Sequence, residues 1–118
     1  MKLRIRGNSL RLRLTKTEVE KLAEQGLVEE KTDFGNGKLF VYAVAISTKS
    51  EVVTADFQNN RISIFIPQTI AETWANGEDV GIYGEQHTLK LLIEKDFNCL
   101  IPRITEEDAD TFPHPKEI

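Results

Sequence analysis

The sequence has few of the features that mark secreted, membrane or disulfide-bonded proteins. Its 118 residues include one cysteine, Cys99, so no disulfide bond can form within the chain. No apolar run approaches the ~20 residues of a membrane-spanning helix. The basic start, residues 1–6, is not followed by the apolar segment of a secretory signal. We therefore expect a cytoplasmic protein that does not enter a membrane.

Motifs for catalysis, metal binding and cofactor binding are also missing. The sequence has no P-loop, no G-x-S-x-G and no H-E-x-x-H. His87, Cys99 and His114 are scattered, whereas structural zinc sites use closely spaced pairs. Asp108 and Asp110 lack the glycine of a calcium loop. We expect no catalytic residue, no metal and no cofactor, and hence a protein that is not an enzyme.

The formal net charge of −4 conceals an uneven distribution of charge. Residues 1–16 contain no acid and six cations, which are Lys2, Arg4, Arg6, Arg11, Arg13 and Lys16. Residues 104–118 contain one cation and five acids, which are Glu106, Glu107, Asp108, Asp110 and Glu117. A protein that binds bulk nucleic acid is usually basic overall. This chain instead combines a basic start with an acidic end.

The cations belong to a predicted β-hairpin. Gly7-Asn8 is a two-residue turn signal between two alternating runs, which predicts that Leu3 faces Leu12 and Arg4 faces Arg11. Side chains of a strand alternate between its two faces. One face of this hairpin is therefore apolar and belongs to the core, with Leu3, Ile5, Leu10, Leu12 and Leu14. The other face carries five cations, Lys2, Arg4, Arg6, Arg11 and Arg13.

Like charges that lie directly opposite each other destabilise a hairpin, so these five cations need a partner. DNA, another polyanion or an acidic protein would supply the opposite charge. The alternative is a solvated face, or one that pairs with Glu29, Glu30 or the acidic end of the chain. The residues alone leave these alternatives open.

The plan of residues 7–26 returns 52 residues later, at 59–78. In each copy a turn and an apolar strand precede a short helix, and two further strands follow. In the first copy the second of these strands, 39–46, is apolar on both faces, which predicts a central strand. An alignment without gaps predicts two β-β-α-β-β halves, 2–46 and 54–98, related by a pseudo-two-fold axis. Residues 1–98 would form one mainly β domain, and 99–118 would form a C-terminal extension with an acidic, proline-containing tail.

Two short motifs carry a resemblance to a known family. Gly7-Asn8-Ser9, Arg13-Leu14 and Lys16 resemble the G-N-S-x-x-x-R-[IL]-P-K signature of the AbrB/MazE swapped-hairpin family, and 77–80 (GEDV) resembles its glycine-acid-valine step. The resemblance implies a β-barrel built from two β-β-α-β-β halves, here in one chain, and a DNA-binding or antitoxin-like role. The opening 1–15 and the later DFNCL and FPHP also resemble a group of small bacterial proteins without an assigned activity.

The second copy departs from that family in its charge. The five cations of the first hairpin correspond to Thr54, Asp56, Gln58, Ser63 and Phe65. A two-fold-symmetric DNA reader should keep its cations in both halves, because half-sites mirror the symmetry of the protein. A monomer of this chain would have one basic face, and a homodimer would have two.

The sequence therefore predicts a non-catalytic binding module that uses the basic hairpin on DNA or another polyanion. The alternative is a protein-interaction or antitoxin-like partner that uses the hairpin face or the tail. In the tail, Phe112 would be the docking anchor, with Asp108 and Asp110 beside it. The alternative for the tail is an extension without a docking role.

One hypothesis is that the acidic tail shields the basic hairpin, within the molecule or across a dimer; the alternative is that deleting the tail changes only solubility. Deleting residues 106–118 should then raise the affinity for heparin or DNA, and the gain should shrink steeply with salt because polyanion binding releases counterions. Replacing Arg4 and Arg11 by glutamate should abolish the gain. Equal elution of the full-length and truncated proteins from a heparin column at low salt would reject this expectation.

Overall fold

The computed structural model describes residues 1–97. In the first half of this part lie β1 (Lys2–Arg6), β2 (Ser9–Leu14), α1 (Lys16–Gln25), β3 (Leu27–Asp33) and β4 (Leu39–Ser47). In the second half lie β5 (Thr54–Gln58), β6 (Arg61–Pro67), α2 (Gln68–Asn76), β7 (Gly81–Gln86) and β8 (Leu89–Lys95). The mainly β fold is thereby confirmed. Neither helix has the length and apolar content that a membrane crossing requires.

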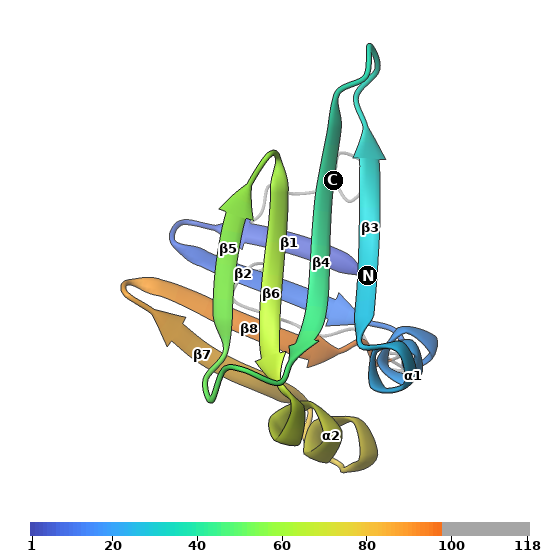
Figure 1. The fold of residues 1–118 in the computed structure, drawn as a ribbon, viewed down its shortest axis with the longest axis vertical. Helices are drawn as coiled ribbons and strands as arrows, with labels where there is room; N and C mark the ends of the chain where they lie inside the picture. Colours follow the sequence, from blue (N-terminus) through green and yellow to red (C-terminus); the bar gives the residue numbers. More distant parts are fainter. Residues whose placement is uncertain (98–118) are drawn as a thin grey trace, which may run out of the picture.

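The strands form two four-stranded sheets, and each sheet takes one hairpin from each half of the chain. Sheet A has the order β1-β2-β8-β7, and sheet B has the order β3-β4-β6-β5. The central pairs, β2 with β8 and β4 with β6, are parallel, and the outer pairs are antiparallel. The strands of the two sheets cross at a steep angle, and both helices lie at one corner (Figure 1). The two halves are therefore interleaved.

The register of the sheets corrects the predicted alignment without gaps. Ile93 lies opposite Leu12 just as Val44 lies opposite Ile64. Val28 and Ile82 take the equivalent places on the neighbouring outer strands. The offset between equivalent residues of the two halves therefore changes along the chain. It is 52 in the first hairpin (Leu12/Ile64), 54 in the third strand of each half (Val28/Ile82) and 49 in the fourth (Val44/Ile93). A longer connection after α2 and a shorter β7–β8 turn explain the change.

The predicted closed barrel is wrong, because the two sheets remain separate. Their edge strands β5 and β7 approach each other without a backbone ladder. Instead, the side-chain amide of Gln86 on β7 donates to the carbonyl oxygen of Ala55 and accepts from its N–H, both at 2.9 Å. One side chain thus satisfies backbone groups at the sheet edge that a barrel would pair with another strand.

The core lies between the two sheets and beneath the helices. Leu12, Leu14, Ile64 and Ile66 are at most 1% exposed and occupy equivalent positions of β2 and β6. The predicted hairpin register is confirmed, with Leu3 opposite Leu12 and Arg4 opposite Arg11. Ile5, expected in the core, is 57% exposed because it lies near the tip of its hairpin.

The first helix is fixed at both ends and to the start of the chain. Thr15 and Glu18 form a capping box, and Gly26 ends the helix with φ of 78°. The Met1 ammonium donates to Glu18 Oε2 at 2.6 Å and to Glu30 Oε1 at 2.9 Å, which ties β1 to α1 and β3. Burial alone would lower the pKa of this ammonium, but the two carboxylates raise it above its ordinary value.

This ammonium contact predicts a pH dependence of stability. The raised pKa of Met1 means that its contribution is complete below the unfolded value of 8.0 and is lost as pH rises through the folded pKa. For Glu18, burial raises the pKa but the ammonium and Thr15 hydrogen bonds lower it on balance, so its contribution is lost as pH falls below about 4.5. Stability should be greatest between these limits.

The measurement compares chains with a free and an acetylated Met1, both without a tag. At pH 7 the acetylated chain should be less stable by roughly 1 kcal/mol. The difference should disappear as the ammonium of the free chain loses its proton above pH 8. Identical urea unfolding curves at pH 7 would show that the contact contributes nothing.

Candidate functional site

The outward face of sheet A carries six cations. Because side chains alternate along each strand, β1 and β2 turn their leucines inward and present Lys2, Arg4, Arg6, Arg11 and Arg13 on the other side. Lys90 of β8 joins them, since it pairs with Ser9 of β2. We call these six residues the basic face. Lys2, Arg6 and Lys90 are exposed, and the other three are half-buried.

Strand pairing places these cations close together. Arg4 lies opposite Arg11, and Lys2 lies opposite Arg13. A hollow of about 230 Å³ opens among Arg4, Arg6, Ser9, Arg11, Lys90 and Leu92. Four of its six lining residues are cations, one has a hydroxyl group, and none is an acid. This composition suits an anion with several oxygen atoms, because arginine side chains bind phosphate through paired hydrogen bonds.

Acidic side chains border the basic face at two places: Glu94 and Asp96 lie at the end nearest the helices, and Glu85 of β7 lies opposite Lys90. Arg11 Nε lies 3.1 Å from Glu94 Oε1, and Lys2 Nζ lies 3.4 Å from Asp96 Oδ2. The Tyr83 hydroxyl donates to Glu94 Oε2 at 3.3 Å. Burial and the neighbouring Glu94 carboxylate raise the pKa of Tyr83, so the phenol stays a neutral donor. These acids neutralise part of the charge and fix the position of Arg11.

The outward face of sheet B differs from the basic face although its strands are equivalent. The positions that match the five hairpin cations hold Thr54, Asp56, Gln58, Ser63 and Phe65. Arg61 on this face has Nη1 at 2.8 Å from Glu29 Oε2, and this hydrogen bond lowers the pKa of Glu29. Within residues 1–97, the clustered cations therefore occur on sheet A alone.

The structure brings together all five cations that the sequence singled out, and it adds Lys90. Alternation of Leu89, Leu91 and Ile93 could have shown that Lys90 points outward. Its position beside Ser9 depends on the parallel pairing of β2 with β8, which no local pattern encodes. The remaining predicted residues, Cys99, Asp108, Asp110, Phe112 and His114, lie outside the described residues.

No group of three or more His, Cys, Asp or Glu side chains in the described part of the chain is arranged to hold a metal ion. His87 lies in the turn between β7 and β8, with φ of 56°.

Comparison with known proteins places the chain in one family. The chain belongs to a family of unknown function, DUF7009, whose family model matches residues 1–116. No curated protein and no solved structure matches the chain.

Proposed function

We propose that this member of the DUF7009 family is a non-catalytic module that binds DNA or another polyanion through the basic face. The observation that carries the proposal is the hollow among Arg4, Arg6, Arg11 and Lys90, which has no acid in its lining. A phosphate group in this hollow would meet three guanidinium groups and one ammonium group. The resemblance of 7–16 to AbrB/MazE-type hairpins favours DNA among the polyanions.

The expected mode of binding is contact with the phosphate backbone. A sheet face with one patch of cations can neutralise several phosphates without inserting an element into a groove, so affinity should depend little on base sequence. The outward face of sheet B has no equivalent patch, so a single chain lacks the symmetry that paired half-sites require. A single chain would therefore bind one short stretch of the phosphate backbone, and paired half-sites would require two chains.

Salt dependence provides the test. If four phosphates are neutralised, log K for a labelled 20-bp duplex should fall with a slope of about −4 against log salt, or about 10²-fold between 50 and 200 mM. Replacing Arg6 and Lys90 by glutamine should reduce that slope by about 2. Both side chains are exposed, and the ion pairs to Glu94 and Asp96 are made by Arg11 and Lys2.

The matched control replaces Lys31 and Lys38 by glutamine, because both are exposed and belong to the opposite hairpin β3–β4. This variant has the same net charge as the first and should bind like the unchanged protein. An equal loss in both variants would show that only net charge matters and would contradict the proposed face. Absence of binding to duplex DNA, single-stranded DNA and heparin at 50 mM salt would reject the proposal.

A second candidate function is binding to another protein, and a different surface favours it. An apolar hollow of about 400 Å³ lies between the ends of the β1–β2 and β5–β6 hairpins. Ile5 and Phe57 line it and are 57% and 66% exposed. Phe40, Leu10 and Ile62 form its deeper part. If no polyanion binds, this hollow is the surface on which a partner protein should be sought.

A further inference from the structure

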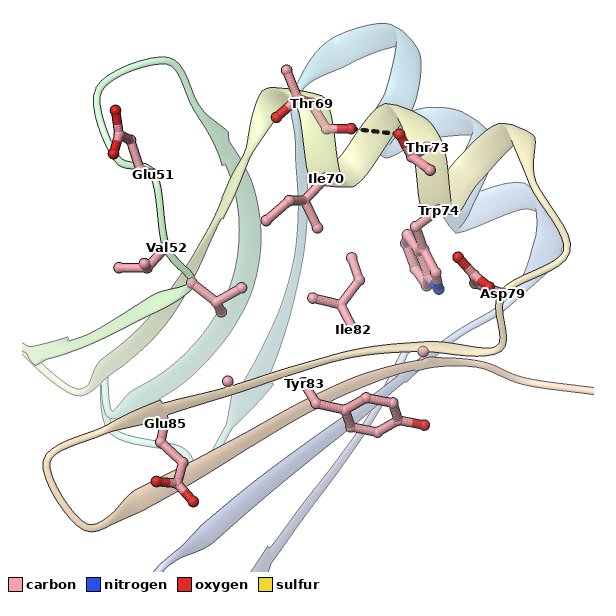
Figure 2. Close-up of a pocket in the computed structure, with 13 residues that line it drawn as sticks. Glu51, Val52, Thr69, Ile70, Thr73, Trp74, Asp79, Ile82, Tyr83 and Glu85 are labelled. Atoms are coloured by element: carbon pink, nitrogen blue, oxygen red, sulfur yellow. Dashed lines mark hydrogen bonds between the residues drawn. The ribbon is translucent and has the colours of Figure 1, made fainter.

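The outward face of sheet A continues past the cations to an exposed aromatic ring, that of Tyr83 on β7. This residue is 60% exposed. A hollow of about 570 Å³ lies on the inner side of β7, and the Tyr83 ring points away from it, on the side of the strand opposite Ile82 and Trp74 (Figure 2). Of the described residues that face outward on sheet A, Tyr83 alone is aromatic. Contact with a phosphate backbone by itself makes no use of this ring.

Strand pairing places the ring in one row with two guanidinium groups. Arg4 of β1 lies opposite Arg11 of β2. Leu92 of β8 lies between Arg11 and Tyr83, because it pairs with both. Neighbouring strands are about 4.8 Å apart, so the backbones of Arg11 and Tyr83 are separated by roughly 10 Å. One nucleotide has about this length, from its phosphate to the far edge of its base.

Two adjoining hollows divide this face into a charged part and a largely apolar part. The hollow of about 230 Å³ among the cations adjoins a second hollow of about 390 Å³, because Lys90 and Leu92 line both. The rest of the second lining consists of Tyr83, Gly84, Glu85 and Leu91. Four cations line the first hollow, whereas an aromatic ring and two leucines line much of the second. The first suits a phosphate group, and the second suits a flat ring.

Gly81 lets the Tyr83 ring lie along β7. A Cβ atom at Gly81 would lie 2.8 Å from the Tyr83 hydroxyl oxygen and 3.0 Å from its Cζ, so the phenol occupies the place of a side chain at position 81. The hydroxyl donates to Glu94 Oε2 at 3.3 Å, which fixes the far end of the ring. The ring therefore lies over bare backbone while most of the residue stays open to solvent. An aromatic ring held in this way can stack on a nucleobase.

The acids near the ring determine which part of a nucleotide can lie there. Glu85 stands two residues after Tyr83 on β7, and Glu94 pairs with Gly81, two residues before it. Both therefore face outward, one on each side of the ring. Carboxylates repel a phosphate, so the phosphates belong over β1 and β2 and an uncharged base belongs over Tyr83. The distribution of charge across the sheet thus favours one orientation of the ligand.

We propose that the outward face of sheet A binds nucleic acid with unpaired bases, one of which stacks on Tyr83 while its phosphate lies among Arg4, Arg11 and Lys90. This inference rests on the proposed function and narrows its ligand. The bases of a duplex are paired and stacked on one another, so their faces cannot reach a ring on a sheet, whereas unpaired bases can. Single-stranded DNA and single-stranded RNA share this chemistry.

The test separates the contribution of a base from that of its phosphates. Labelled ligands of one length are titrated: a thymidine 12-mer, a uridine 12-mer, an abasic deoxyribose-phosphate 12-mer and a 12-bp duplex. Stacking of one base should make the thymidine 12-mer bind at least about 5-fold tighter than the abasic strand. This ratio should stay constant between 50 and 200 mM salt, because the phosphates contribute equally to both ligands.

Variants of Tyr83 show whether the ring carries this difference. Tyr83→Leu should lower the affinity for the thymidine 12-mer roughly 5-fold, to about that of the abasic strand, and leave binding of heparin and the duplex unchanged. Tyr83→Phe keeps a ring and should bind like the unchanged protein. Phe57→Leu is the matched control, because Phe57 is 66% exposed and belongs to sheet B, and it should change nothing.

Ring signals in NMR spectra give a direct readout of stacking. The chain has two tyrosines, and Tyr42 lies on β4, where its hydroxyl donates to the Met1 carbonyl oxygen at 3.4 Å. The thymidine 12-mer should shift the ring signals of Tyr83 and leave those of Tyr42 in place. The abasic strand should shift neither set.

The outcomes separate this inference from the proposed function. If heparin and the abasic strand bind but Tyr83→Leu leaves the affinity for the thymidine 12-mer unchanged, the stacking site is wrong and the basic face stands. An equal loss for the single strand and the duplex would overturn the stacking site as well. If none of these polyanions binds, both proposals are wrong. Tighter binding of the uridine 12-mer than of the thymidine 12-mer would identify RNA as the ligand, and the reverse would identify DNA.

Discussion

The parallel pairing of two central strands in each sheet is the constraint on which the rest of the molecule depends. Parallel neighbours need a long connection between them, and here β2 and β8 are joined through residues 15–88, whereas β4 and β6 are joined through residues 48–60, which contain β5. Neither half can complete a sheet by itself, because each supplies one hairpin to each sheet. The basic face, with Lys90 beside Ser9, exists only because the two halves interleave.

Pseudo-symmetry preserves the core but not the surfaces. Equivalent positions of β2 and β6 are filled by Leu12 and Ile64, each 1% exposed. The outward positions of the same strands differ in charge, with Arg11 on one and Ser63 on the other. A packed interior tolerates few changes of volume, whereas a solvated position tolerates most. The basic face therefore lies where packing leaves the residues unconstrained.

The sequence predicted the local parts of the structure and missed those that depend on distant strands. Alternation and the Gly7-Asn8 turn determined the hairpin register and hence the face of all five cations. The same reasoning failed after α2, because a longer loop and a shorter turn shift the offset without disturbing the apolar pattern. Lys90 was missed for a related reason, since its place beside Ser9 depends on the parallel pairing of two distant strands.

The most direct test of the account locates the polyanion on the folded protein. Amide and arginine Nε signals are recorded by NMR while a short DNA duplex is added at 50 mM salt. The account predicts that the largest shifts fall on β1, β2 and the first residues of β8, with β3 and β5 unchanged. Largest shifts on the outward face of sheet B, or no shift in a folded chain at saturating DNA, would contradict it.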